Sequence, residues 1–97
     1  MPKGYWIVRL DVTDKEQYKK YVAVAPAVVE QFGGRFIVRA GRFEVPEGVA
    51  RSRNIVVEFS SYQAALDCWH SPAYQQAIAL RQPATTIDLV IVEGFDS

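Results

Sequence analysis

One short segment of the chain, residues 68–83, holds most of the side chains that could do chemistry. It contains the only cysteine, Cys68, and the only histidine, His70, together with Tyr74 and Arg81. Histidine titrates near neutral pH and can act as a general acid or base, so His70 is the candidate catalytic residue. In the alternative interpretation, His70 stabilises the C-terminal end of a helix, where the helix dipole favours a cation.

Two arginines are candidates for holding an anion. A guanidinium can bind a carboxylate or an enolate through two parallel hydrogen bonds, which makes Arg39 and Arg81 candidate ligand-binding residues. Each could equally pair with Glu58 or Glu93 and neutralise the interior of the protein. The aromatic candidates for the wall of a binding pocket, which could instead be plain core, are Tyr5, Trp69 and Tyr74.

The remaining reactive groups fit structural roles as well as chemical ones. Glu58 is a candidate ligand-binding residue and, like Asp11, could act as a carboxylate base if burial raised its pKa. Either residue could instead form a structural ion pair. Cys68 lies beside a tryptophan in an apolar helix, so we expect an inert, buried thiol.

Composition excludes several classes of protein. The 97 residues predict a single domain, residues 1–97, and the 11 basic and 11 acidic side chains cancel. That balance gives no electrostatic footprint for nucleic acid or an anionic membrane. A single cysteine fits a reducing compartment, and one cysteine with one histidine is too few for the usual zinc sites. Without a secretion-type leader or an apolar run of about 18 residues, we expect a cytoplasmic protein with no metal or cofactor.

Apolar periodicity predicts six elements of secondary structure. Alternation indicates strands, and apolar residues at three- and four-residue steps indicate helices between them. The predicted strands cover residues 5–12, 35–40, 53–59 and 87–95. The first helix runs to about Phe32, ends at Gly33-Gly34 and is expected to kink or break at Pro26. The second helix is interrupted and restarted at Ser71-Pro72.

Finer details of these elements can also be predicted. Thr13 with Glu16, and Ser60 with Gln63, form capping boxes that begin the two helices. Residues 41–45 could extend the second strand through a bulge at Gly41. The last strand is apolar on both faces apart from two acids, so we expect it to lie centrally in the sheet.

The order of these elements is strand, helix, strand, strand, helix, strand. It predicts an α+β fold of the ferredoxin-like βαββαβ type, a four-stranded antiparallel sheet with its helices on one face. Trp6, Val8, Leu10 and Val12 should face the helices. The other face would carry Tyr5, Ile7, Arg9, Ile37, Arg39, Val56 and Glu58. That set is too apolar to face water, so we expect a homodimer in which two sheets pack face to face and close a barrel.

Several motifs together resemble one bacterial family. They are Gly4-Tyr5-Trp6-Ile7, the helical segment 21–27, Gly33-Gly34-Arg35-Phe36, and His70-Ser71-Pro72-Ala73-Tyr74-Gln75 followed by Leu80-Arg81. In order and spacing, from about Gly4 to Gly94, they resemble domain of unknown function 1330. The resemblance implies a member of the dimeric α/β-barrel superfamily. Relatives there include cofactor-independent monooxygenases, haem-degrading enzymes, muconolactone isomerase-like proteins and ligand-sensing domains. The family offers no established catalytic residues to transfer.

These observations lead to two functional hypotheses. In the first, a homodimer binds a small metabolite in a cleft between the sheet and the broken helix. Cofactor-independent acid–base chemistry of the isomerase or monooxygenase type would then use His70 for proton transfer and Arg39 or Arg81 to hold the anion. In the second, the protein is a non-catalytic binding or structural homodimer whose charges only close the barrel.

Overall fold

The computed structural model describes residues 2–95 and contains the predicted order of elements. The elements are β1 (Gly4–Val12), α1 (Lys15–Gln31), β2 (Arg35–Arg39), β3 (Arg53–Phe59), α2 (Tyr62–His70), α3 (Pro72–Arg81), the short 3-10 helix η1 (Gln82–Ala84) and β4 (Thr85–Glu93). The α+β class and the interruption of the second helix are therefore confirmed.

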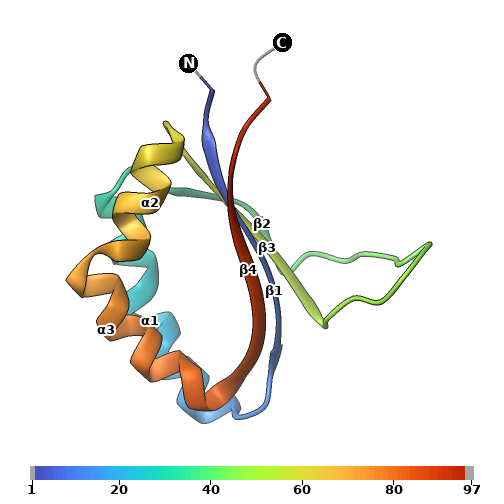
Figure 1. Ribbon diagram of the computed structural model, residues 1–97. Helices are drawn as coiled ribbons and strands as arrows, with labels where there is room; N and C mark the ends of the chain where they lie inside the picture. Colours follow the sequence, from blue (N-terminus) through green and yellow to red (C-terminus); the bar gives the residue numbers. More distant parts are fainter. Residues whose placement is uncertain (1, 96–97) are drawn as a thin grey trace.

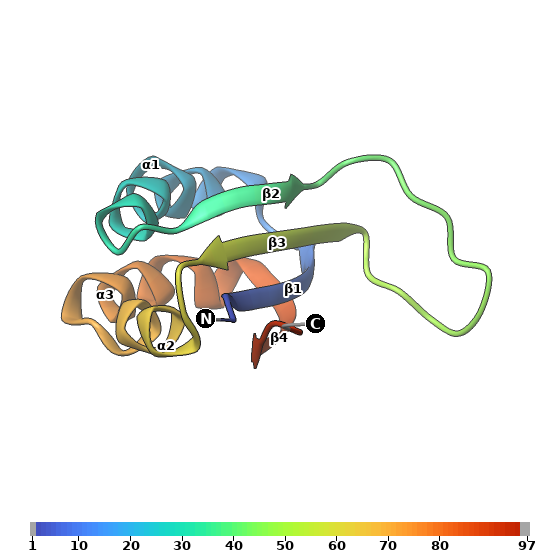
Figure 2. The same cartoon turned by 90° about the horizontal axis from the view of Figure 1, so that it is seen from above.

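The four strands form one antiparallel sheet in the order β2-β3-β1-β4. All helices cover the same face, as Figures 1 and 2 show, so the ferredoxin-like prediction is confirmed. The prediction that the last strand lies centrally is wrong, because β4 pairs only with β1 and forms an edge. Its second apolar row, Val90 and Val92, is exposed on the side away from the helices.

The two faces of the sheet differ in burial. On the inner face, which the helices cover, Trp6, Val8 and Leu10 are buried as predicted. The same face receives Ile87, Leu89 and Ile91 from β4, which pack against the core. The outer face lies opposite, and within residues 2–95 no helix covers it (Figure 1).

A bulge in β2 changes which side chains face inward. Phe36 pairs with Val57 and Val38 with Val56, so the extra residue is Ile37 rather than the predicted Gly41. Because a bulge shifts the alternation by one residue, Arg39 lies opposite Ile55. Ile55 faces the core, so the prediction that placed Arg39 on the outer face is wrong. The strand ends at Arg39, and residues 41–45 do not extend it.

The connection from β2 to β3, residues 40–52, forms an arm that points away from the helices (Figure 1). Its C-terminal end is fixed by Arg51, whose Nε donates to Asp88 Oδ2 at 2.6 Å and whose Nη1 donates to Asp11 Oδ2 at 3.0 Å. The backbone N–H of Ser52 donates to Asp11 Oδ1 at 2.8 Å. These contacts join the arm to both β1 and β4.

Helix starts differ from the prediction by one residue each. Asp14, not Thr13, accepts from the N–H of Gln17 at 3.1 Å, and Ser61, not Ser60, caps α2. Ser71 acts as predicted, since its hydroxyl accepts from the N–H of Tyr74 at 3.2 Å and donates to the carbonyl of Cys68 at 2.7 Å. One side chain thus ends α2 and begins α3.

Helix α1 continues through Pro26, so of the predicted kink or local break, the break is wrong. Proline has no N–H, so the helix lacks the bond that residue 26 would donate to the carbonyl of Val22. Gly33, with φ of 76°, follows the end of the helix as expected. Gly34 permits close packing, because a Cβ there would meet Val29 Cγ1 at 2.5 Å.

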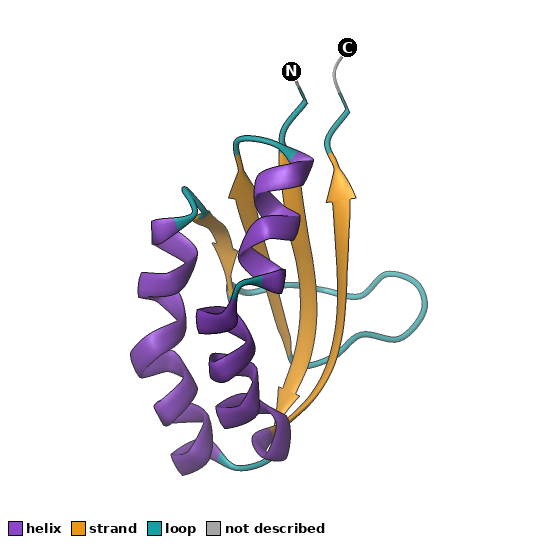
Figure 3. Ribbon diagram, turned by 60° about the vertical axis from the view of Figure 1, so that its left-hand side comes forward, coloured by secondary structure: helices purple, strands orange, loops and turns teal. Residues whose placement is uncertain are grey.

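Helices α1 and α3 lie side by side over the sheet (Figure 3). The side chain of Gln17 joins them by donating to the carbonyl of Leu80 at 3.0 Å. Within residues 2–95, no helix combines the length and the hydropathy needed to cross a bilayer.

Candidate functional site

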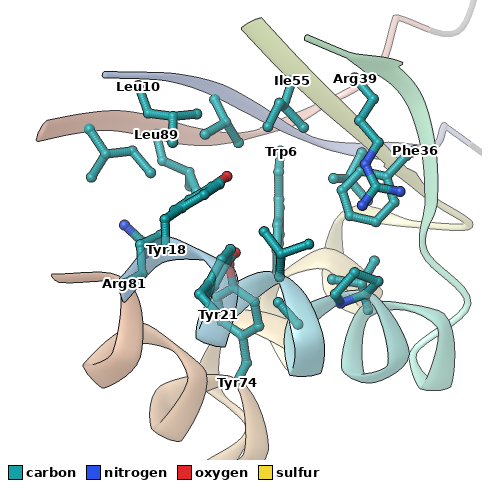
Figure 4. Close-up of a pocket in the computed structure, with 17 residues that line it drawn as sticks. Trp6, Leu10, Tyr18, Tyr21, Phe36, Arg39, Ile55, Tyr74, Arg81 and Leu89 are labelled. Carbon is teal, nitrogen blue, oxygen red and sulfur yellow. The ribbon is translucent and has the colours of Figure 1, made fainter. Parts of the chain in front are cut away.

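A narrow cavity of about 50 Å³ lies between the inner face of the sheet and helices α1 and α3 (Figure 4). Most of its wall is apolar or aromatic, and its polar side chains are tyrosines and arginines. The residues that line it include Trp6, Tyr18, Tyr21, Val22, Pro26, Phe36, Arg39, Tyr74 and Arg81. One buried water needs about 10–15 Å³, so the cavity has room for a few waters or for one end of a small ligand.

Arg81, in the last turn of α3, is the most unusual residue of the cavity. Its side chain is only 3% exposed, yet among residues 2–95 no acidic side chain pairs with it. Its Nε is buried without a hydrogen-bond partner. The guanidinium carbon lies 5.5 Å from the ring centroid of Tyr21, a cation–π contact. A buried, unpaired cation is costly, so this geometry favours an anionic ligand.

Two tyrosine hydroxyls meet beside this arginine. The hydroxyls of Tyr21 and Tyr74 are 2.5 Å apart, and either can be the donor. Burial raises the pKa of both phenols, and for Tyr21 the hydrogen bond with Tyr74 and the charge of Arg81 oppose that rise. Both are therefore neutral near pH 7, and the pair can donate one hydrogen bond beyond its own.

Trp6 separates the cavity from the packing behind it. Its Nε1 donates to the carbonyl of Ala65 at 3.0 Å, and its ring lies 4.8 Å from that of Tyr74 and 5.9 Å from that of Trp69. These contacts fix Trp6 and Tyr74 in a rigid aromatic cluster. Trp69, a predicted pocket residue, belongs to this cluster but does not line the cavity.

Arg39 lies on the other side of the cavity from Arg81 (Figure 4). Its guanidinium carbon is 4.6 Å from the centroid of the Phe36 ring, and no acidic side chain of residues 2–95 pairs with it. The bulge at Ile37 places it there. The predicted anion-binding residues Arg39 and Arg81 and the predicted Tyr74 therefore lie around one cavity.

The other predicted site residues lie elsewhere. His70 is exposed at the end of α2 and does not line the cavity. Its catalytic role stays a prediction. Cys68 is fully buried, and burial raises its pKa to about 12, which fits the expected inert thiol.

Glu58 and Tyr5 lie together on the outer face. Glu58 accepts from Lys3 at 3.1 Å, from Arg35 at 3.2 Å and from the hydroxyl of Tyr5 at 3.4 Å. The hydrogen bond from Lys3, followed by the charges of Lys3 and Arg35, holds the pKa of this carboxyl below its usual value. A lowered pKa opposes a role as a base, so the geometry favours the structural ion pair.

Sequence reasoning missed several cavity residues because it assigned them to the core. Tyr18 and Tyr21 belong to the apolar stripe of α1, where their phenol groups were treated as plain packing. A usable signal was present, since a stripe that buries two hydroxyls near the interior needs partners for them. Trp6 gave the same indication, because its buried indole N–H also needs a hydrogen-bond partner.

No cluster of three or more His, Cys, Asp or Glu side chains suited to a metal occurs among residues 2–95.

Fold and cavity together define a small α+β protein of the ferredoxin-like class with a cationic, aromatic cavity beneath its helices. The chain belongs to the family described as domain of unknown function DUF1330, whose model matches residues 3–95. No curated protein matches the sequence.

Solved structures agree with this assignment. A protein of unknown function from Rhodopseudomonas palustris is similar with a TM-score of 0.78 at 19% identity, over 99% of this chain and 85% of that one. SnoaB, a cofactor-independent oxygenase from Streptomyces nogalater, is similar with a TM-score of 0.66 at 11% identity, over 100% of this chain and 97% of that one. A dimeric ferredoxin-like protein of unknown function from Thermobifida fusca is similar with a TM-score of 0.54 at 13% identity, over 95% of this chain and 89% of that one. At these identities the likeness concerns the fold.

Proposed function

We propose that this protein binds a small organic anion, a carboxylate or an enolate, in the cavity beneath α1 and α3. The observation that carries the proposal is Arg81, a 97% buried cation (3% exposed) without an acidic partner in residues 2–95. A ligand oxygen at this guanidinium would form charge-assisted hydrogen bonds and remove the cost of the lone charge. The apolar wall around Trp6 and Phe36 would hold the carbon skeleton.

The hydroxyl pair of Tyr21 and Tyr74 supports the same ligand class. One hydroxyl hydrogen remains after the pair has formed its own bond, and it can be donated to a second ligand oxygen. The pair can thus select an anion with two adjacent oxygens. His70 has no part in this proposal, because it does not line the cavity.

The binding proposal is tested by titrating the purified protein with butyrate and with its amide, butyramide. The carboxylate should bind and the neutral amide should bind at least about tenfold more weakly, since one charge-assisted contact is lost. Arg81→Met should remove this discrimination. Lys20→Met, which removes an exposed charge from α1, is the matched control and should leave the affinity unchanged. Equal binding of the two ligands by the unchanged protein would contradict the proposal.

We propose further that two copies associate through the outer faces of their sheets. Supporting this, the outer face exposes a row of aliphatic side chains, with Ile7 at 39%, Val90 at 57% and Val92 at 41% exposure. Such a patch is typical of an interface. The Thermobifida fusca relative, described as dimeric, adds support by analogy. Sedimentation equilibrium at micromolar concentration should give twice the mass of the 10.9 kDa chain, and a monomer would contradict this part.

A catalytic activity rests on analogy alone. SnoaB is a cofactor-independent oxygenase, and its fold is similar to that of this chain. Within the cavity, the groups able to donate a proton are the neutral tyrosine hydroxyls. The geometry therefore favours binding as the primary function.

A further inference from the structure

A second group of cations, Lys15, Lys19 and Arg53, lies at the edge of the cavity. A groove open to solvent runs between α1 and the end of the sheet, lined by Val12, Lys15, Tyr18, Lys19, Val22 and Arg53. Tyr18 and Val22 line both this groove and the cavity. The two spaces are therefore neighbours that share a wall.

Arg53 is the central residue of this groove. It begins β3 and pairs with Leu10, whose side chain is buried on the inner face, so Arg53 also points toward the helices. Its guanidinium carbon lies 5.5 Å from the ring centroid of Tyr18, and within residues 2–95 no carboxylate pairs with it. Like Arg81, it rests on an aromatic ring instead of an acid.

Among the cations that line the groove with Arg53, only one is paired with an acidic side chain of residues 2–95. Lys15 also has no acidic partner in the described part of the chain, whereas Lys19 is bound to Glu16 at 3.1 Å. On the neighbouring strand, Arg39 lies opposite Ile55, which places Arg39 and Arg53 diagonally on the inner face. Both guanidiniums are cations on the same face of the sheet, so an anion near them is attracted by both.

Two of the arginines each contact one tyrosine of α1. Arg53 contacts Tyr18, Arg81 contacts Tyr21, and the centroids of these two rings are 5.6 Å apart. A ligand held at Arg81 can bury only a few atoms, because the cavity measures about 50 Å³. The rest of a longer ligand can extend past Tyr18 and Val22, which line both spaces, toward Arg53 and Lys15.

We infer that the ligand carries two anionic groups, one held at Arg81 and a second held in the groove at Arg53 and Lys15. This inference rests on the proposed binding function and defines its ligand class as a dicarboxylate or a comparably doubly acidic small molecule. The first group lies in a buried, aromatic site that gives directional hydrogen bonds. The second lies in a wetter site where charge attraction dominates, so its contribution falls with added salt.

The test compares dicarboxylates with monocarboxylates of the same chain length, from succinate against butyrate to pimelate against heptanoate. At least one diacid should bind about tenfold more tightly than its monoacid, as expected for one added charge-assisted contact. Arg53→Met should abolish this preference while leaving the affinity for the monoacid within about twofold. Lys15→Met should reduce the preference in part and serves as the second variant if Arg53→Met does not fold. Lys20→Met is the control and should keep it.

The outcomes separate this inference from the proposed function. If monoacids bind through Arg81 but no diacid is preferred, or if the preference survives Arg53→Met, the second subsite is refuted and the cavity proposal stands. If neither class binds, or if Arg81→Met changes nothing, the cavity proposal itself fails.

Discussion

The ion pairs of the outer face contrast with the arginines on the helix side of the sheet. On the outer face, Glu58 pairs with Lys3 and Arg35, and Arg51 pairs with Asp11 and Asp88. On the helix side, Arg39 and Arg53 of the sheet and Arg81 of α3 lie on aromatic rings, and within residues 2–95 none has an acidic partner.

The difference separates charges paired within the protein from charges that, in our proposal, bind a ligand. A paired surface charge costs little and needs no further explanation. An unpaired guanidinium in an apolar cavity lowers the stability of the empty protein, so its presence points to a ligand that completes it. Burial alone would not make this distinction, because Cys68 is also buried and its thiol is expected to be inert.

Val90→Asp on the outer face should have the largest effect, because it would place an unpaired charge in the proposed interface. We expect the dimer dissociation constant to rise by at least about 100-fold. Sedimentation velocity over a concentration series measures it. Val24→Asp, an exposed change on α1, is the matched control and should leave the dimer intact. An unchanged dimer in Val90→Asp would show that the outer face is not the interface.

Arg81→Met on the inner face should stabilise the empty protein. Methionine fills much of the same space and removes a buried, unpaired charge, so we expect the free energy of unfolding to rise by about 1–3 kcal/mol. Urea denaturation without ligand measures this change. Arg51→Met on the outer face should act in the opposite direction, since it breaks two ion pairs. A loss of stability in Arg81→Met would mean that the arginine has a partner within the protein.

Tyr21→Phe and Tyr5→Phe compare a hydroxyl on each face. Tyr21→Phe leaves the buried hydroxyl of Tyr74 without its partner and should cost about 1–2 kcal/mol of stability. Tyr5→Phe removes only a long bond of 3.4 Å to Glu58 and should cost less than about 0.5 kcal/mol. Thermal and urea unfolding of both variants measure the difference. Equal losses would place the two hydroxyls in equivalent environments and contradict the cavity geometry.

Acid should weaken the ion pairs of the outer face, and this loss of stability should be the smallest of the predicted effects. The folded-state pKa of Glu58 lies below its ordinary 4.5 because of hydrogen bonding from Lys3, and that of Asp11 lies below 3.8 because of the Ser52 N–H. A lowered pKa contributes stability above the unfolded value and loses it as pH falls through the folded one. Glu58→Gln should therefore flatten the decline in stability below about pH 4.5, whereas Arg81→Met should leave its slope unchanged. The free energy of unfolding from pH 7 to pH 3 tests both.

Much of the fold could be predicted because local signals agree with it. Alternation gave β3 its observed bounds, and Ser71-Pro72 has the hydroxyl and the fixed backbone that end one helix and begin another. The predicted caps failed by one residue, since Thr13 precedes Asp14 and Ser60 precedes Ser61, and either neighbour has a suitable side chain. The types of the two neighbouring side chains therefore do not decide which one caps the helix.

The position of β4 was mispredicted for a physical reason. A strand that is apolar on both faces indicates burial on both, and sequence cannot distinguish burial by other strands from burial by another molecule. The exposed Val90 and Val92 fit the second case.

The candidate site was predicted in part. Arg81 and Tyr74 were found because they share a helical face with Ala77. Arg39 was chosen for its guanidinium but assigned to the wrong face, because no residue type marks a bulge at Ile37. His70 was chosen because it is the only imidazole, a property of composition that says nothing of position.

Pro26 gives the cavity a property that its side chains do not have. The carbonyl of Val22 receives no N–H from residue 26, and both residues lie on the side of α1 that lines the cavity. A backbone oxygen that lacks its helical donor can accept a hydrogen bond from another donor. Among the anions of similar size that Arg81 would admit, this oxygen favours one that also bears a hydroxyl or an amino group, so a hydroxy acid should be held more tightly than its deoxy counterpart.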